Sequence, residues 1–141
     1  MAITGLNKLE TVDYISEKDP CKSEAEGATV FVLGSVDKEI IGAIKDSMQS
    51  LEMVDGKQKI VMNTSASYIK ACRVGLRGWR NFKDSEGKDI PFKLEEGYPF
   101  GKAMKIVSKE TMEKIPLDLA IELGQAIVDK NSKMDANLLK N

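Results

Sequence analysis

The 141-residue sequence contains no histidine, and this absence removes several kinds of functional site. Serine and cysteine nucleophiles that need an imidazole base are excluded, and so is the commonest side-chain ligand of transition metals. The two cysteines, Cys21 and Cys72, stand far apart, which argues against both a zinc site and a disulfide framework. We therefore expect no metal, no cofactor and a reducing compartment.

Long apolar runs and a strong net charge are also missing. No apolar stretch approaches the roughly 20 residues of a membrane-spanning helix, and residues 1–5 lack the basic start and the hydrophobic stretch of a signal peptide. The formal net charge of −1 gives no overall field that would attract nucleic acid or an acidic membrane. We expect no membrane partner, and only a local basic stripe is left for nucleic acid.

What is present is the composition of a globular domain, with 42% hydrophobic and 30% charged residues rather than the bias of a disordered chain. A chain of this length fits one domain. We assign residues 28–131 to it, preceded by an extended N-terminal arm, residues 1–27, and followed by a flexible polar tail, residues 132–141. The arm is expected to lie on the domain or on a neighbouring subunit, unless it is simply an unattached terminus.

The most distinctive pattern runs from residue 67 to residue 92, and its first part predicts a helix that Thr64 or Ser65 caps. The apolar face of this helix consists of Ile69, Cys72, Leu76 and Trp79. A basic stripe beside it consists of Lys70, Arg73, Arg77 and Arg80. Gly75 and Gly78 each weaken a helix by roughly 0.8–1 kcal/mol relative to alanine, which indicates that another backbone approaches closely there.

These features each have two interpretations. The basic stripe is either a solvated helix face or a site for a phosphate or an acidic partner. Trp79 and Phe82 are either core anchors or an exposed recognition patch. The candidate partner-binding residues are Lys70, Arg73, Arg77, Trp79, Arg80 and Phe82. No catalytic residue is identified, because spacing singles out no pair among the 22 acidic residues.

The second part of the pattern predicts a tight turn and then an extended strand. Gly87 supplies a position with positive φ, and the strand begins at Ile90, because a residue that precedes proline avoids the helical region. The acidic residues of the turn do not form an EF-hand calcium loop. Glycine stands at the fourth place instead of the sixth, and Lys88 occupies a ligand position.

The flanking segments complete an α+β fold, in which a small, mainly antiparallel sheet is packed by about three helices. Residues 28–33 read as a buried strand, and Ser35 or Asp37 caps a helix that runs to about Leu51. A hairpin turns through residues 55–56. Residues 92–95 and 103–107 form an antiparallel pair, and Ser108 caps a short helix. Pro116 starts the last helix, whose buried face includes Leu117.

Three segments carry a resemblance to a known group of proteins. They are VGLRGWRNF at residues 74–82, DIPF at residues 89–92, and IPL at residues 115–117, where the last helix opens. Together with the strand that leads into residues 36–37, they resemble tail assembly chaperones and related small morphogenesis proteins of tailed bacteriophages. The likeness covers roughly residues 28–131.

The resemblance implies a virion assembly protein that is not an enzyme. Such a protein binds the tape measure protein in the host cytoplasm, keeps its hydrophobic helices soluble and recruits tail tube subunits. The long arm and the insertion at residues 53–58 are less typical. They leave open a structural subunit of the virion, in the tail, connector or surface layer, that contacts neighbouring subunits through its arm and strand edges. A homo-oligomer is expected.

Two further expectations concern the basic stripe and the methionines. An accessory factor that binds a host protein or nucleic acid through the stripe is a third hypothesis. A chaperone needs an adaptable apolar surface, and flexible methionines suit one, although they also fill gaps in cores. The methionines considered for this surface are Met48, Met53, Met62, Met104 and Met112.

Overall fold

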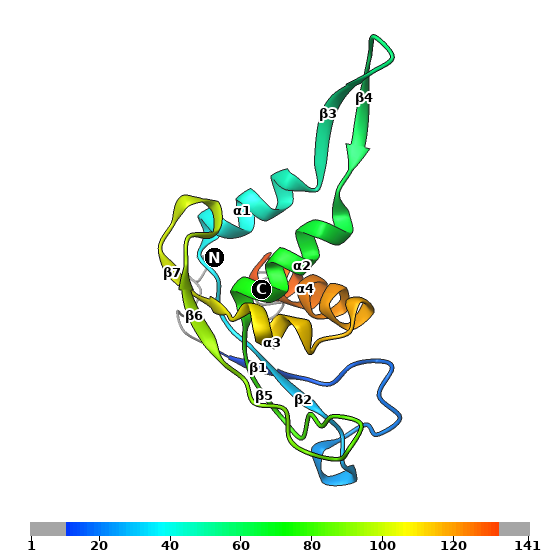
Figure 1. The fold of residues 1–141 in the computed structure, drawn as a ribbon, viewed down its shortest axis with the longest axis vertical. Helices are drawn as coiled ribbons and strands as arrows, with labels where there is room; N and C mark the ends of the chain where they lie inside the picture. Colours follow the sequence, from blue (N-terminus) through cyan, green and yellow to red (C-terminus); the bar gives the residue numbers. More distant parts are fainter. Residues whose placement is uncertain (1–10, 133–141) are drawn as a thin grey trace, which may run out of the picture.

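The computed structural model describes residues 11–132 and shows an α+β fold (Figure 1). In chain order the elements are β1 (Val12–Tyr14), η1 (Glu24–Glu26), β2 (Val30–Leu33), α1 (Lys38–Ser47), β3 (Gln49–Val54), β4 (Lys57–Met62), α2 (Thr64–Gly75), β5 (Leu76–Arg80), β6 (Leu94–Gly97), η2 (Pro99–Gly101), β7 (Met104–Val107), α3 (Lys109–Glu113) and α4 (Leu117–Ser132). Three small antiparallel sheets accompany three substantial helices, α1, α2 and α4, which confirms the predicted fold class.

The largest sheet is built around β2, whose apolar run is the buried strand that the sequence predicts. Its order is β1-β2-β5, and both pairings are antiparallel. Phe31 lies opposite Trp79 of β5 and opposite Tyr14 of β1. The described part of the predicted arm, residues 11–27, therefore lies against residues of the same chain. Residues 1–10 of the arm and residues 133–141 of the predicted tail fall outside the described residues.

Helix α1 and the β3–β4 hairpin differ in one respect from the prediction. Asp37 caps α1 by accepting a hydrogen bond from the amide of Glu39. The helix ends at Ser47, so its predicted extension to Leu51 is wrong. Leu51 instead pairs with Ile60 in the hairpin, whose base is closed by the Asn63 amide donating to the Met48 carbonyl at 2.7 Å. Residues 55 and 56 have positive φ at its turn, which confirms the predicted hairpin.

The central helix also ends earlier than predicted. Asn63, not Thr64 or Ser65, is the N-cap of α2, and the helix stops at Gly75. Leu76 is extended and starts β5, which pairs with β2. The single helix predicted to run through residue 80 is therefore wrong. The helix ends at Gly75 because tertiary pairing with β2 begins there. The Gly34 amide donates a hydrogen bond to the Gly75 carbonyl at 2.8 Å.

Helices α2 and α4 form the centre of the core. Gly75 lies against Ile127 of α4, so a close approach is present there, although it involves a side chain. At Gly78 the predicted close approach is wrong, because a methyl group would meet nothing within 4 Å. Leu123 and Ile127 of α4 are fully buried. Leu117 is 63% exposed, so its predicted place on the buried face is also wrong; it is the first residue of α4, and the buried residues of the helix begin at Ala120.

The remaining sheet and α3 follow the prediction closely. Strands β6 and β7 form the expected antiparallel pair, and Ser108 caps α3 by accepting from the amide of Thr111. The extended strand predicted from Ile90 is wrong, because β6 begins only at Leu94. Pro91 has no N–H to donate, and the Ile90 carbonyl accepts from the indole of Trp79 instead.

Candidate functional site

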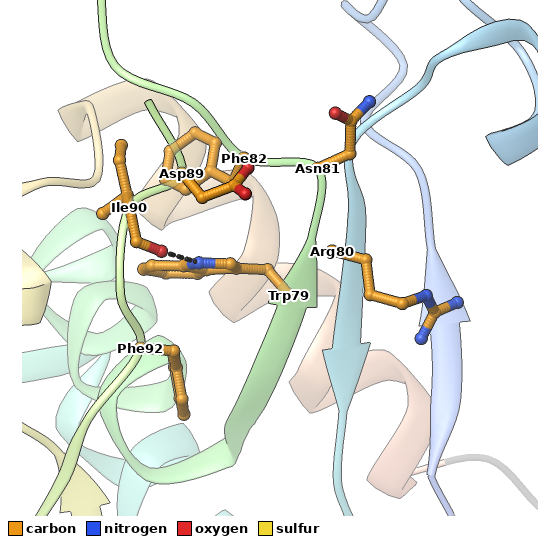
Figure 2. A pocket seen from close by; sticks show the side chains of 7 residues that line it. All are labelled: Trp79, Arg80, Asn81, Phe82, Asp89, Ile90 and Phe92. Atoms are coloured by element: carbon orange, nitrogen blue, oxygen red, sulfur yellow. Dashed lines mark hydrogen bonds between the residues drawn. The ribbon is translucent and has the colours of Figure 1, made fainter. Parts of the chain in front are cut away.

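Trp79 and Phe82, two of the predicted partner-binding residues, lie in an aromatic cluster (Figure 2). The ring of Trp79 is 4.8 Å from that of Phe82 and 4.9 Å from that of Phe92, and both contacts are edge-to-face. Phe31, fully buried in β2, contacts Trp79 and Phe82 in the same manner. Trp79 is half-buried, and its indole N–H donates to the Ile90 carbonyl at 2.8 Å. The cluster thus joins the sheet to the loop that follows β5.

A cavity of about 300 Å³ opens beside this cluster. Its lining consists of Trp79, Arg80, Asn81, Phe82, Asp89, Ile90 and Phe92. The aromatic rings supply apolar walls and Asp89 lies at the edge of the cavity, whereas the side chain of Arg80 points away from it (Figure 2). The cavity is small and open, so it offers a shallow contact surface instead of an enclosed ligand site.

The predicted basic stripe is divided between a helix and a strand. Lys70 and Arg73 belong to α2, whereas Arg77 and Arg80 belong to β5. Arg73 donates to the Val107 carbonyl at 2.9 Å and pairs with Glu95 at 2.6 Å. The ammonium of Lys70 lies 5.5 Å from the centre of the Phe100 ring.

The two arginines of β5 also point at groups of the same chain. Arg77 donates to the carbonyls of Lys105 and Val74, and burial lowers the pKa of its guanidinium. Arg80 is exposed, and hydrogen bonds to Glu24 and then Asp13 raise its pKa. All four cations of the predicted stripe therefore have partners within the chain, and three of them hold separate segments together.

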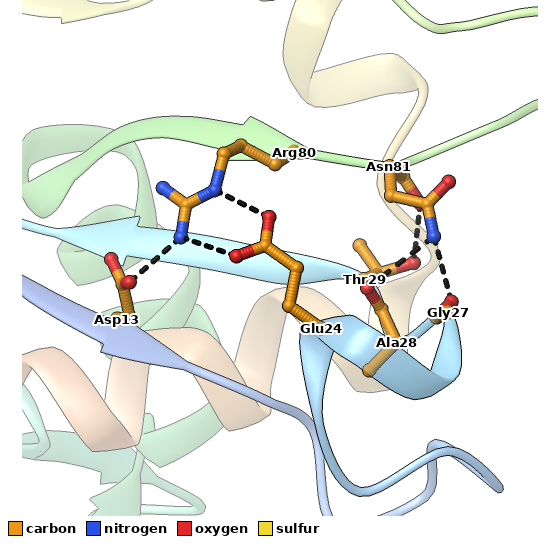
Figure 3. A network of polar contacts seen from close by, with 7 residues as sticks. All are labelled: Asp13, Glu24, Gly27, Ala28, Thr29, Arg80 and Asn81. Carbon is orange, nitrogen blue, oxygen red and sulfur yellow. Dashed lines mark hydrogen bonds and ion pairs between the residues drawn. The ribbon is translucent and has the colours of Figure 1, made fainter.

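Arg80 and Asn81 fasten residues 13–29 to the end of β5 (Figure 3). Arg80 forms ion pairs with Asp13 and Glu24, both at 2.7 Å. The Asn81 amide group donates to the Gly27 carbonyl at 2.7 Å, and the Thr29 hydroxyl donates to the Asn81 carbonyl at 2.8 Å. This network anchors the segment that follows β1.

A second anchor of the same segment is Glu122 on α4, which sequence reasoning missed. Its carboxylate accepts hydrogen bonds from the Tyr14 hydroxyl at 2.5 Å, the Ser16 hydroxyl at 2.7 Å and the Glu17 amide at 3.1 Å. Burial raises the pKa of Glu122, but these hydrogen bonds lower it by more, so the pKa lies below its ordinary value. Burial and the bond to Glu122 raise the pKa of Tyr14. No sequence signal marks this contact, because it joins residues about one hundred positions apart.

The β3–β4 hairpin is largely exposed, and Figure 1 shows it extending away from the helices. One face of it carries no charge and consists of Gln49, Leu51, Met53, Gln58, Ile60 and Met62. We call this the uncharged face. Four of its side chains are large and apolar, and each is more than 60% exposed. The opposite face consists of Ser50, Glu52, Val54, Lys57, Lys59 and Val61.

The five methionines considered for an adaptable surface, all within the described residues, do not form one continuous surface. Met53 and Met62 belong to the uncharged face of the hairpin and are 67% and 61% exposed. Met48, Met104 and Met112 are partly buried against the core. The expected adaptable surface is thus limited to the hairpin, and the three other methionines fill space at the edge of the core.

A further cavity, of about 430 Å³, lies between α2 and the turn that joins β6 to β7. Arg73 and Glu95 form one wall, and Tyr98 and Phe100 of the turn form another. Tyr98 is 75% exposed, so this region adds an aromatic side chain to the accessible surface.

The described part of the chain shows few other features that indicate chemistry. Burial raises the pKa of the Cys72 thiol to about 12, which keeps it protonated and unreactive. Between residues 11 and 132, no helix is long and apolar enough to cross a membrane. Nor do three or more potential metal-ligating residues gather in that range. Comparison with known protein families, with curated proteins and with solved structures found no match to this chain.

Proposed function

We propose that this protein is a bacteriophage tail morphogenesis protein that acts by binding other proteins, in the manner of a tail assembly chaperone. The bacteriophage part of the proposal rests on the resemblance of residues 74–82, 89–92 and 115–117. The observation that supports a binding role is the β3–β4 hairpin with its uncharged face. On this proposal the client is the tape measure protein, and tail tube subunits are recruited afterwards in the host cytoplasm.

The uncharged face has the properties that a helical client requires. Burying apolar surface contributes about 25 cal/mol per Å², so covering Leu51, Ile60 and Met53 would stabilise a complex. None of these side chains contributes to the core of the chain, because each is between 66% and 68% exposed. Unbranched methionines adapt to clients of different shape, and an amphipathic helix presents a complementary apolar face.

The alternative is a structural subunit of the virion, and a different observation favours it. Within the described residues, β3 and β4 pair only with each other, so each has a free outer edge. A neighbouring subunit can add a strand to such an edge and gain main-chain hydrogen bonds. A subunit of this kind stays in the particle, whereas a chaperone leaves it.

Co-expression with the tape measure protein of the same phage tests the chaperone proposal. We expect the tape measure protein to stay soluble and to co-purify with the wild-type chain. The double variant Leu51→Ser with Ile60→Ser should lose this effect, because it makes the uncharged face polar. The matched control is Glu52→Ser with Val54→Ser, which changes two residues of the opposite face. A tape measure protein that is equally insoluble with and without the chain would contradict the proposal.

Mass spectrometry of purified particles decides between the two roles. A chaperone is expected to be absent from mature particles. Many copies per particle would instead support the structural subunit.

A further inference from the structure

We propose that two copies of this chain pair through the outer edges of their β4 strands, antiparallel and around a twofold axis. The joined hairpins then form one four-stranded sheet in the order β3-β4-β4-β3. This inference goes beyond the proposed function and holds for a chaperone and for a structural subunit alike. It rests on the directions of the backbone groups in the hairpin, on the surroundings of its two edges and on the side chains that the pairing brings together.

The outer edge of β4 carries backbone groups that have no partner strand. Val54 and Lys57 flank the two-residue turn, and residues in that position bond to each other across the hairpin. The Asn63 amide donates to the Met48 carbonyl at the base, which fits the same alternation. The residues whose backbone groups point outward from β4 are therefore Gln58, Ile60 and Met62. Within residues 11–132 no strand pairs with this edge, so it is a template for a strand of another copy.

The surroundings of the hairpin favour β4 over β3 as the pairing edge. α1 ends at Ser47, just before β3, and Figure 1 shows it running away from the base of the hairpin on the β3 side. A strand that paired along the whole of β3 would meet this helix. No described element lies beside the outer edge of β4 in that view. An antiparallel pairing also places the two bodies at opposite ends of the joined sheet, so they do not collide.

One register uses the whole outer edge of β4 and brings no like charges together. It places Ile60 opposite Ile60 of the second copy and Gln58 opposite Met62, so the outward-facing residues supply about six main-chain hydrogen bonds. Lys59 then lies opposite Val61, which is half-buried. A shift of two residues toward the turn would place Lys59 opposite Lys59, which is unfavourable. The same shift in the other direction would run the pairing into α2.

The joined sheet unites the uncharged faces of both copies. Residues directly opposite each other in an antiparallel pair have their side chains on the same face of the sheet. The two Ile60 side chains therefore contact each other, and each has Met62 of the other copy as a diagonal neighbour. These side chains are 66% and 61% exposed in the single copy, so the contact removes apolar surface from water. Leu51 and Met53 of both copies stay open on the same face.

Sedimentation equilibrium of the purified full-length chain, from micromolar to millimolar concentration, tests the proposal. We expect a monomer–dimer equilibrium for the wild type. Ile60→Pro should lower the association constant about tenfold or more, because both copies lose the N–H at the centre of the joined sheet. The hairpin itself keeps its ladder, since this N–H does not point at β3. The matched control is Leu51→Pro at the directly opposite position, which blocks the β3 edge in the same way and should dimerise like the wild type.

Disulfide cross-linking tests the register independently of the proline variants. The Cα atoms of the two Ile60 residues should be about 5.5 Å apart, a distance that a disulfide spans. Ile60→Cys in a Cys21→Ser background should therefore link two copies under mild oxidation, while the native Cys72 is buried. The controls are Met62→Cys on the same strand and Leu51→Cys on β3. Neither should cross-link, because neither residue lies opposite its own counterpart.

Four outcomes would overturn the proposal. One is a wild type that stays monomeric over the whole concentration range. Another is an equal loss of association for Ile60→Pro and Leu51→Pro, since the uncharged face or the stability of the hairpin would then control association. A third is cross-linking through Leu51→Cys but not through Ile60→Cys, which would assign the contact to β3. The last is association that continues beyond the dimer, because a twofold contact closes on itself.

Discussion

Gly124 of α4 lies directly against the backbone of Tyr68 in α2, so closely that a methyl group at position 124 would overlap the Tyr68 carbonyl. Glycine is required here for space, because neither backbone can move without separating the two helices. This contact sets the distance between α2 and α4. The tight fit of Gly75 against Ile127 adds a second close approach between the same helices.

The first prediction is that Gly124→Ala destabilises the protein. Alanine in a helix is ordinarily favoured by about 1 kcal/mol over glycine. Forcing a methyl group into packed backbone costs about 1–3 kcal/mol, and the overlap with backbone atoms here places the cost at the upper end, so the net effect should be a loss of roughly 2 kcal/mol. Urea unfolding followed by circular dichroism measures it. The control is Gly42→Ala within α1, where nothing lies within 4 Å and a small gain is expected. Equal changes in the free energy of unfolding for Gly124→Ala and Gly42→Ala would contradict a steric requirement for glycine at position 124.

The second prediction concerns the pH dependence that Glu122 imparts. Its pKa in the folded state is lowered below the ordinary value of 4.5, so its ionised form stabilises the fold above that value. This contribution is lost as the pH falls through the lowered pKa. Glu122→Gln should therefore be less stable than the wild type at neutral pH, and the difference should shrink in acid. Thermal unfolding at a series of pH values measures this.

Tyr14→Phe provides the companion variant, because it removes the shortest hydrogen bond to Glu122 and leaves the ring in place. It should lose part of the same stability, and its effect should become small in the Glu122→Gln background. Parallel pH profiles for the wild type and Glu122→Gln would show that the carboxylate does not act in this way.

Several elements follow from local sequence rules. The apolar run of β2, the turn of the β3–β4 hairpin, the β6–β7 pair and the cap of α3 are all determined by residues close together in the chain. The end of α2 is not. Leu76 and Trp79 continue the helical spacing of Ile69 and Cys72, so the pattern predicts helix where β5 pairs with β2. Tertiary pairing overrides the local helical preference here. In the sequence, only the glycines at positions 75 and 78 indicate that the helix is interrupted.

Only part of the candidate site can be predicted from the sequence. The sequence predicts that Trp79 and Phe82 are either core anchors or a recognition patch, and in the structure the two rings contact each other. The predicted basic stripe on one helix is wrong, because Arg77 and Arg80 lie on strand β5. The exposure of Leu51 and Ile60 could not be predicted, since an apolar residue in a strand is ordinarily buried. The contacts of Glu122 depend on the whole chain being folded.

The third prediction distinguishes a structural role of Trp79 from a role in partner binding. Trp79→Ala should destabilise the fold by about 3 kcal/mol, because it removes the centre of the aromatic cluster. Trp79→Phe should cost about 1 kcal/mol, since it keeps an aromatic ring but leaves the Ile90 carbonyl without its donor. Urea unfolding by circular dichroism gives both values. A fully stable Trp79→Ala variant that no longer binds its partner would identify Trp79 as an interface residue.

The fourth prediction is that the β3–β4 hairpin opens far more readily than the core. A two-stranded hairpin without cover is only marginally stable in water, and the large apolar residues of its uncharged face are exposed. Hydrogen exchange read by mass spectrometry, at a dilution where the chain is monomeric, should therefore show fast exchange in residues 49–62. Exchange in α2 and α4 should be slow, because both helices are packed in the core.

The same measurement shows whether the hairpin is the element that binds. Protection of residues 49–62 should rise when copies assemble or when a client is added, while the protection of α2 and α4 stays nearly constant. The control is the loop at residues 83–89, whose described residues are exposed and which takes no part in the proposed contacts. Slow exchange in the hairpin of the dilute monomer would contradict the prediction, because it would mean that the hairpin is stable without a partner.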